Sequence, residues 1–288
     1  IKIRSGNVTV DNIDVTKFTQ DGITAYKNID MPNLRIMNCR VSDIQPGYWG
    51  FGIYVGYESE GWGYSPPDLT NHLDFSGLFI ANNEITNSHS SGLVLQAITG
   101  TPGTLVVSNN VCHGISLNSG IWIDCARNLT VVDNTVSANK WGIEFTAYAE
   151  ADQTLNGPYS PKDIVLDGNI VTNNLQQGIV LYEAWPATIS ILNNWIEGNG
   201  TGLQNLLSES VDAGRNYWGA ADGPGGEGDG SGDTISTGVT YASYYINSTM
   251  TTLVAPIVQV DDDFTPSTPG WGEYAFATIQ AGVNGTVS

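Results

Sequence analysis

Leu105-Val-Val-Ser-Asn-Asn110 and Ile189-Ser-Ile-Leu-Asn-Asn194 are two copies of the short motif that decides the fold, two apolar residues in alternation followed by Asn. The copies of this motif begin at Val8, Leu34, Leu78, Leu105, Leu129, Ile164, Ile189 and Val211. The repeated unit is therefore about 22 to 27 residues long, and two of the turns carry insertions. Self-similarity at such a period indicates a solenoid, with the insertions as loops on one side of the stack.

Alternating apolar residues indicate two short strands in each unit. Leu129 and Val131 lie two positions apart, and this period of two places them on one face of a strand, which we expect to point inward. A second strand follows a glycine, as in Gly120-Ile-Trp-Ile123, and we expect this glycine to have the positive φ of a sharp bend. Two or three short strands per turn predict an all-β fold, a parallel β-helix of about eight coils.

Asn recurs five places into six of the eight copies, and these residues should stack at one corner of the coil. They are Asn83, Asn110, Asn134, Asn169, Asn194 and Asn216. The Asn amide bonds both to turn backbone and to the next Asn, so we interpret the set as a structural ladder and not as a site.

Residues 8–216 with these motifs resemble the right-handed parallel β-helix repeat family, the pectin-lyase-like architecture. The segment Asn216-Tyr-Trp-Gly219 resembles the stretch that ends such helices in secreted bacterial and archaeal surface proteins. We therefore expect a β-helix over residues 1–218 and a Gly/Asp-rich extension over residues 219–288. The family includes lyases, hydrolases, epimerases, adhesins and surface-layer components, so the fold leaves the function open.

The composition disfavours polyanionic partners. The chain has 288 residues, with 10 basic against 29 acidic side chains and a net charge of −19, and it would repel nucleic acid and anionic membranes. No apolar run approaches the roughly 20 residues of a membrane helix. Because the chain begins with Ile and carries no signal peptide, we interpret it as a mature or excised segment of an exported, extracellular protein.

Asn-X-Ser/Thr sequons are candidate glycosylation sites of a surface protein. They occur at Asn7, Asn128, Asn199, Asn247 and Asn284.

The three cysteines cannot all be paired within one chain. Cys112 shares the register of Val41, Ile85 and Val136 and is interpreted as a buried apolar residue. Cys39 and Cys125 lie three turns apart, which at about 4.8 Å per turn exceeds the reach of a disulfide. A bridge between subunits through Cys39 or Cys125 remains as the alternative.

The C-terminal segment resembles the opening of a β-helix of this family, in which an acidic turn and Phe-x-Thr-Ile-Gln precede the first coil. We hypothesise that residues 274–287 of one subunit complete the first turn of the next by strand addition, which generates filaments. The residues of this joint are Phe276, Thr278, Ile279, Gln280, Val283 and Val287 in the tail and Ile1 and Ile3 in the head. The alternative is a fragment of a longer polypeptide, cut just inside its next domain.

Asp124 and Glu144 are the candidate catalytic pair if the protein is an enzyme. They face outward from adjacent turns with an offset of two residues, a spacing that suits an inverting pair of carboxylates. The simpler interpretation is a pair of solvated surface charges near Arg127 and Lys140. No lyase-like base beside a calcium-binding carboxylate cluster is visible.

Aromatic residues gather in both insertions, where they favour a glycan-binding platform or a protein contact. They are Tyr48, Trp49, Phe51, Tyr54, Tyr57, Trp62 and Tyr64 in the first, and Tyr148, Tyr159 and Trp185 around the second. For a self-assembling protein we prefer the protein contact.

Acidic turns near the C-terminus are candidate calcium ligands, although neither matches an EF-hand loop. The residues are Asp222, Asp229, Asp233, Asp261, Asp262 and Asp263. The three His residues lack metal-ligand spacing, and no other cofactor is expected.

These observations favour a structural protein over an enzyme. We expect a subunit of an extracellular sheath, S-layer or filament, similar to archaeal β-helix surface proteins, whose main partner is itself. The alternative is a secreted polysaccharide-binding or polysaccharide-degrading protein, a lyase or glycoside hydrolase.

Overall fold

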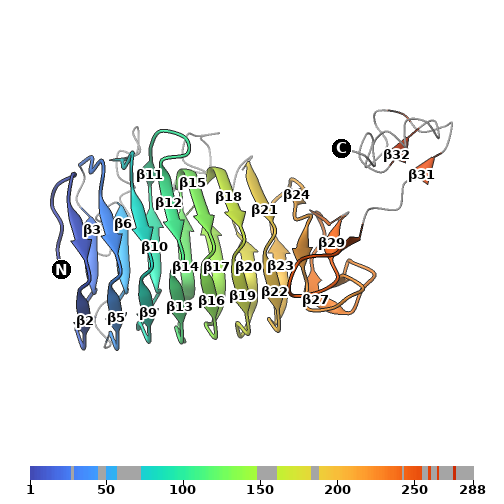
Figure 1. Cartoon of the computed structure of the whole chain (residues 1–288), viewed down its shortest axis with the longest axis horizontal. Coiled ribbons are helices and arrows are strands. Elements are labelled where there is room, and N and C mark those ends of the chain that lie inside the picture. The colour runs from blue at the N-terminus through green and yellow to red at the C-terminus, as the bar shows by residue number, and fades with distance from the viewer. Residues whose placement is uncertain are drawn as a thin grey trace.

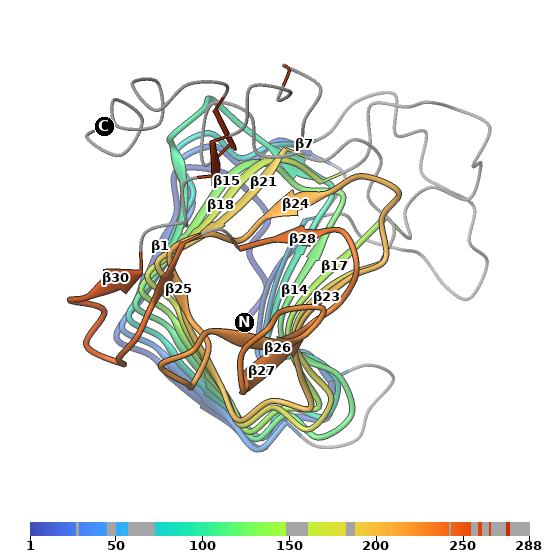
Figure 2. The ribbon, with the colours of Figure 1, turned by 90° about the vertical axis from the view of Figure 1, so that its right-hand side faces the viewer.

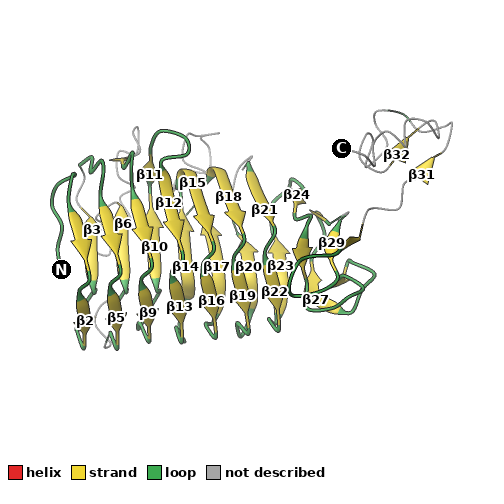
Figure 3. Cartoon of the chain, in the orientation of Figure 1, coloured by secondary structure: helices red, strands yellow, loops and turns green. Residues whose placement is uncertain are grey.

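The structure is a computed structural model, and it consists of strands and loops. It describes residues 1–26, 29–44, 50–56, 73–147, 161–182, 188–241 and 243–254, together with 259–260, 265 and 275–276. Within these ranges every regular element is a β-strand (Figures 1 and 3). The strands succeed one another along the long axis of the molecule, which places the first and last coils at opposite ends of a stack.

Three sheets form the walls of this stack (Figure 2). Sheet 1 contains β1 (Thr9–Asp11), β4 (Arg35–Met37), β8 (Phe79–Ala81), β12 (Leu105–Ser108), β15 (Arg127–Val132), β18 (Lys162–Asp167), β21 (Ile189–Leu192), β24 (Val211–Asp212) and β28 (Val239–Thr240). Sheet 2 contains β2 (Asp14–Thr16), β5 (Arg40–Ser42), β9 (Glu84–Thr86), β13 (Val111–His113), β16 (Thr135–Ser137), β19 (Ile170–Thr172), β22 (Trp195–Glu197), β25 (Asn216–Tyr217), β29 (Tyr244–Tyr245) and β30 (Leu253–Val254). Sheet 3 contains β3 (Ile23–Tyr26), β6 (Ile53–Gly56), β10 (Leu93–Gln96), β14 (Ser119–Asp124), β17 (Trp141–Thr146), β20 (Gln177–Leu181), β23 (Thr201–Asn205), β27 (Gly232–Ile235) and β26 (Pro224–Gly226).

Each coil visits the three sheets in turn, and neighbouring coils pair in parallel. Leu129 of β15, for example, lies opposite Ile164 of β18, and Ile143 of β17 lies opposite Ile179 of β20. A small additional sheet joins β7 (Leu73–Asp74) to β11 (Ile98–Thr99). The two long insertions both fall between a strand of sheet 3 and the next strand of sheet 1, on one side of the coil as the sequence predicts. The predicted parallel β-helix is confirmed.

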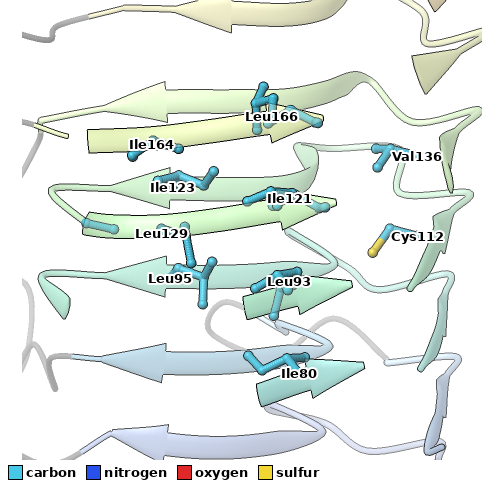
Figure 4. Close-up of a cluster of buried hydrophobic side chains, with 14 of the residues drawn as sticks. Ile80, Leu93, Leu95, Cys112, Ile121, Ile123, Leu129, Val136, Ile164 and Leu166 are labelled. Atoms are coloured by element: carbon cyan, nitrogen blue, oxygen red, sulfur yellow. The ribbon is translucent and has the colours of Figure 1, made fainter. Parts of the chain in front are cut away.

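Stacked apolar side chains fill the interior (Figure 4). Ile80, Val107 and Val131 are neighbours in one column of sheet 1, and each is completely buried. Cys112 continues the corresponding column of sheet 2 between Ile85 and Val136, so its predicted role as an apolar filler is confirmed. Burying a side chain of this size stabilises the fold by about 1.5–3 kcal/mol, and the columns repeat this gain in every coil.

The predicted Asn ladder is present at the corner between sheets 1 and 2. Nδ2 of Asn110 donates a 2.9 Å hydrogen bond to Oδ1 of Asn134, and the same bond continues from coil to coil through Asn216. The residue before each ladder Asn turns the corner with a left-handed backbone, as at Asn109 (φ 55°) and Asp133 (φ 56°). Asn and Asp tolerate this conformation better than other side chains do, which explains the Asn-Asn pairs of the motif.

A second, shorter ladder at the corner between sheets 2 and 3 was not predicted. Asn139 donates from Nδ2 to Asn174, Asn174 donates to Asn199, and Asn199 donates to Oδ2 of Asp233 at 2.8 Å. Asp233 ends the ladder, and its carboxylate also accepts hydrogen bonds from the backbone N–H groups of Gly198 and Asn199. An Asn two residues after the end of β16, β19 and β22, at positions 139, 174 and 199, is the signal that identifies this ladder in the sequence.

The glycines before the sheet 3 strands are needed for a reason other than the predicted one. None of Gly22, Gly52, Gly92, Gly120, Gly142 and Gly178 has a positive φ. Instead, a Cβ on Gly142 would collide with the carbonyl oxygen of Gly178 in the next coil and come within 2.8 Å of Val171 Cγ1. Close approach of successive coils at this corner therefore excludes a side chain.

The three sheets continue past residue 218, the boundary predicted between helix and extension. The Gly/Asp-rich segment that reads as a linker instead supplies β26 and β27, and β27 pairs with β23 in sheet 3. β28 then extends sheet 1, and β29 extends sheet 2. The prediction failed because glycine is normally weak evidence for a strand, which hid β26 and β27 of the eighth coil, and because the ninth coil, with β28 and β29, lacks the Asn motif.

The far C-terminal segment contains one described strand pair. β31 (Gln259–Val260) pairs in parallel with β32 (Ala275–Phe276), and Val260 lies opposite Phe276. Strands of successive coils in the stack pair in the same parallel way.

Candidate functional site

Asp124 and Glu144, the candidate acid pair, lie on adjacent strands of sheet 3. Glu144 is opposite Trp122, and Asp124 is opposite Thr146, so the two carboxylates are offset by two residues as predicted. Their neighbours Ile123 and Phe145 are completely buried in the interior, which places both carboxylates on the outer side of the sheet.

The interpretation of these carboxylates as solvated surface charges is wrong. Asp124 is 0% exposed and Glu144 is 4% exposed. Other outward residues of sheet 3 are covered too, since Val94 and Val180 are completely buried. Alternation along a strand tells which side a residue faces, but it does not tell what packs against the outer side.

A hydrogen-bond network satisfies the Asp124 carboxylate. Gln96 donates from Nε2 to Oδ2 at 2.7 Å, and the Thr146 hydroxyl donates to Oδ1 at 3.0 Å. The network extends outward at both ends, because Tyr54 donates to Gln96 Oε1 and the Trp122 indole donates to Thr146. It therefore crosses four successive strands of sheet 3, β6, β10, β14 and β17.

Glu144 has a different environment and a different proton affinity. Burial, and to a smaller extent the nearby Asp124 charge, raise the pKa of its carboxyl to about 7, although the hydrogen bond that the Ser119 hydroxyl donates to Oε2 and the charge of Lys140 act in the opposite direction. Burial together with the Glu144 charge also raises the pKa of Tyr182. A carboxyl group that keeps its proton near neutral pH, beside a second carboxylate, has the electrostatic character of a general acid. Both groups, however, are screened from solvent.

Aromatic rings cover part of the same face. Phe51 stacks on Tyr54 with ring centroids 5.2 Å apart, and it lies 6.2 Å from the ring of Trp122. Phe51 and Tyr54 are each 7% exposed, so these two rings serve as packing and do not present a glycan-binding platform. The remaining predicted aromatics lie outside the described residues: Tyr48, Trp49, Tyr57, Trp62, Tyr64, Tyr148, Tyr159 and Trp185.

A shallow depression of about 420 Å³ lies elsewhere, on sheet 1. Asn128, Thr130, Val165 and Ser190 line it, together with the single carboxylate of Asp163. The depression is therefore separate from the acid pair of sheet 3.

The predicted calcium ligands do not converge in the part of the chain that the structure describes. Asp222 accepts hydrogen bonds from the backbone and hydroxyl of Ser231, which lower its pKa, whereas Asp233 ends the second ladder. Asp229 is exposed, and no group of three metal-ligating side chains occurs among the described residues. Asp261, Asp262 and Asp263 lie outside them.

The sequons differ in the availability of their amide groups. Asn199 donates to the carbonyl of Val171 and to Asp233, and Asn128 donates to the carbonyl of Gly100. Asn7 is exposed, and its described hydrogen bond uses Oδ1 as the acceptor; Asn247 likewise accepts from Thr249. Asn284 lies outside the described residues.

All three cysteines are buried free thiols. Cys39 is 2% exposed at the end of the Asn ladder, where its backbone N–H donates to Asn83, and Cys125 is completely buried after β14. Burial raises the pKa of Cys39, and it raises that of Cys112 to about 12. In this fold, Cys39 and Cys125 are not presented for a bridge between subunits.

The head of the predicted joint is only partly open. Ile1 is 41% exposed, but Ile3 is buried in the core. Residues 1–3 lie along β3, where the Ile3 N–H donates to the carbonyl of Thr24, so they cover this edge of sheet 3. Phe276 of the tail lies in β32. Thr278, Ile279, Gln280, Val283 and Val287 lie outside the described residues.

One comparison with known proteins agrees with this geometry. Residues 72–156 match the family model described as the right handed beta helix region. The matched segment includes the Asp124–Glu144 pair, and with the parallel sheets it identifies the fold as a right-handed parallel β-helix. No curated protein and no solved structure matches the chain. The fold occurs in both enzymes and structural proteins, so the function must be argued from the residues.

Proposed function

We propose that this chain is a structural protein of the cell surface, a self-assembling subunit of an extracellular sheath, S-layer or filament that grows from head to tail. The observation that carries the proposal is the difference between the two ends of the β-helix. Among the described residues, the edges of sheets 1 and 2 at the first coil lack a second strand partner and lie in a coil with exposed apolar side chains, whereas at the other end an antiparallel strand covers sheet 2 and a strand that contains Pro224 ends sheet 3.

The first coil combines two features of an association surface. Within the described residues, β1 and β2 each have a strand partner on one side only. Ile13 is 39% exposed, Phe18 is 47% exposed and Ile29 is 37% exposed. Unpaired edges beside exposed apolar side chains favour the addition of further strands.

The strands at the last coil do not favour the direct addition of another parallel strand. β30 pairs antiparallel with β29 and ends sheet 2, and Pro224 lies in β26 at the end of sheet 3. Antiparallel covers and edge prolines hinder the addition of another parallel strand. A head-to-tail joint therefore requires a separate segment, and we assign this part to residues 274–287, which would act by strand addition. Because such a contact is heterologous, it propagates into filaments.

The acidic composition supports an extracellular assembly. A net charge of −19 keeps a large assembly hydrated and disfavours contacts with nucleic acid. No helix that is long and apolar enough to cross a membrane occurs among the residues that the structure describes.

Polysaccharide cleavage is the second candidate, and the raised pKa of Glu144 beside Asp124 favours it. Burial of both carboxylates argues against access by a polymer. Product assays on neutral and acidic polysaccharides test this candidate. Cleavage that is abolished by Glu144→Gln or Asp124→Asn would reverse the ranking.

Electron microscopy and sedimentation of the purified chain test the structural proposal. We expect filaments or sheets from the wild type, and their loss in the Ile13→Lys/Phe18→Lys variant and in a chain that ends at residue 273. Leu175→Lys is the matched control, because Leu175 is 77% exposed in the middle of the stack and away from the first coil. Monodisperse wild-type particles, or assembly that survives both changes, would overturn the proposal.

A further inference from the structure

Three aromatic residues form a column on the outer face of sheet 2 near the C-terminal end of the stack. Trp195 of β22 lies opposite Tyr217 of β25, and Tyr217 lies opposite Tyr245 of β29. The neighbouring Ile196 and Asn216 are buried, and Tyr244 packs against the core, so the three rings of the column point outward. All three are partly exposed. Their column lies along the stack, with one ring per coil.

Hydrogen bonds and ring packing hold this aromatic column in place. The Trp195 indole donates to Glu197 Oε2 at 2.6 Å, and the Tyr245 hydroxyl donates to Asn193 Oδ1 at 3.3 Å. The rings of Trp195 and Tyr217 meet edge to face, with centroids 6.2 Å apart. Because the polar atoms of Trp195 and Tyr245 are bonded within the protein, a ligand meets rings whose side-chain entropy is already reduced.

A column of polar side chains leads up to the aromatic column from the N-terminal side, and the two columns meet in β22, which carries both Trp195 and Glu197. Ser137, Thr172 and Glu197 are successive residues of the second outward column of the same sheet, and all three are partly exposed. Glu197 accepts the Trp195 bond through Oε2, which leaves Oε1 as an acceptor for a ligand hydroxyl. The Glu197 charge contributes, after burial, to a raised pKa of Tyr217, which places the two side chains close together.

We propose that this aromatic column, with Glu197 beside it and the polar column continuing from Glu197 toward the N-terminal coils, binds an extended neutral polysaccharide. Pyranose rings present apolar C–H faces that stack on aromatic rings, and their hydroxyl groups need donors and acceptors alongside. The aromatic rings repeat along the surface at the coil spacing of about 4.8 Å, which is similar to the length of one sugar ring in an extended chain. A protein contact of this size would instead favour anchors that enter closed pockets.

Charge restricts the class of polysaccharide. The chain carries a net charge of −19, and Glu197 lies within the surface itself, so uronate-rich or sulfated polymers are repelled. Uncharged polymers meet no such penalty. The ligand class is therefore neutral polysaccharide.

This binding site is independent of the acid pair and of the head-to-tail joint. The column lies on sheet 2, whereas Asp124 and Glu144 lie on sheet 3, and the open edges belong to the first coil. The site therefore adds a function to the proposed assembly, because it would hold an assembled layer to a polysaccharide. Failure of either proposal leaves the other standing.

Retention on microcrystalline cellulose and chitin, and affinity electrophoresis in a soluble neutral β-glucan, test the site with the full chain. We expect the wild type to bind at least one neutral polymer and not polygalacturonate. The Trp195→Ala/Tyr217→Ala variant should bind about tenfold more weakly or worse, because two stacking faces are lost. Trp195→Phe/Tyr217→Phe keeps both faces and should retain most of the binding.

Phe79→Ala is the matched control, since Phe79 is a partly exposed aromatic on the outer face of sheet 1. Circular dichroism and thermal melting check that each variant is folded, and Tyr217→Ala alone replaces the double variant if that protein melts early. Absence of wild-type binding to every neutral polymer overturns the proposal. Glycan binding by the alanine variants that equals wild-type binding also overturns it. If the alanine variants change only the sedimentation of the protein and no glycan binds, the proposal is likewise overturned, because the rings then form a contact between copies of the chain.

Discussion

Asn134 and Asn169 are 35 residues apart in the sequence, yet Nδ2 of Asn134 donates a hydrogen bond of 3.0 Å to Oδ1 of Asn169. Asn134 also donates to the carbonyls of Val107 and Val132, and its own Oδ1 accepts from the backbone and side chain of Asn110. A single buried amide thus links three coils of the β-helix.

Asn134→Ala should lower the free energy of unfolding by about 3 kcal/mol, because several buried polar groups lose their partners at once. Urea denaturation followed by circular dichroism measures the change. Asn87→Gly is the matched control, since Asn87 lies at an exposed corner with φ of 52°, which glycine adopts without strain. Similar losses in the two variants would contradict a special role for the buried ladder.

Gly142→Ala should destabilise the fold by about 3 kcal/mol or more, because the added methyl group collides with the Gly178 carbonyl of the next coil. Gly103→Ala is the control, because it introduces backbone strain without a collision. Gly103 has a φ of 78° and no atom within 4 Å of the added Cβ, so its substitution should cost only about 1 kcal/mol. Equal denaturation midpoints for the two variants would show that steric exclusion at Gly142 is unimportant.

Glu144 makes the stability depend on pH in a direction opposite to that of an ordinary paired carboxylate. Its pKa rises from 4.5 to about 7 on folding, so between these values the folded state keeps a proton that the unfolded state has lost. The stabilising contribution is complete below pH 4.5, and it decreases as the pH rises to about 7, by an amount on the order of 3 kcal/mol.

The Glu144→Gln variant isolates this contribution from that of the other carboxylates. Urea denaturation at several pH values should show the difference in stability between variant and wild type growing in favour of the variant from pH 4.5 to about 7. Above that range the difference should stay constant. Parallel stability curves across the whole range would mean that Glu144 ionises normally in the folded protein.

The repeated core could be predicted from the sequence, whereas the environment of the acid pair could not. The core depends on contacts within one coil and with the next coil, and these contacts repeat along the stack. Each copy of the motif therefore carries the same signals, the period-two alternation and the Asn at a fixed place. The burial of Asp124 and Glu144 depends on what covers the outer face of sheet 3, and no local pattern reports that. The sheet 3 strands of the eighth coil were missed for a similar reason, because Gly225 and Gly232 form strands through their neighbours and not through their own propensity.

The aromatic column illustrates the same limit. Trp195, Tyr217 and Tyr245 are separated by 22 and 28 residues, and the last of them lies beyond the final Asn motif. Only the observed register brings Tyr245 opposite Tyr217.

Hydrogen bonding should decide which sequons are glycosylated in a host that modifies Asn-X-Thr. The amides of Asn128 and Asn199 are donors in hydrogen bonds that hold the coil together, at 2.8 Å to the Gly100 carbonyl and at 2.8 Å to Asp233. A glycan replaces one of the two N–H hydrogens of the amide, so at Asn199, whose Nδ2 donates both to Val171 and to Asp233, it would break a hydrogen bond of the second ladder. Folded protein should therefore carry glycans at Asn7 and Asn247 in preference to Asn199. Glycopeptide mass spectrometry measures the occupancy at each site. High occupancy at Asn199 in folded, thermally stable protein would show that the second ladder tolerates the loss of its terminal hydrogen bond.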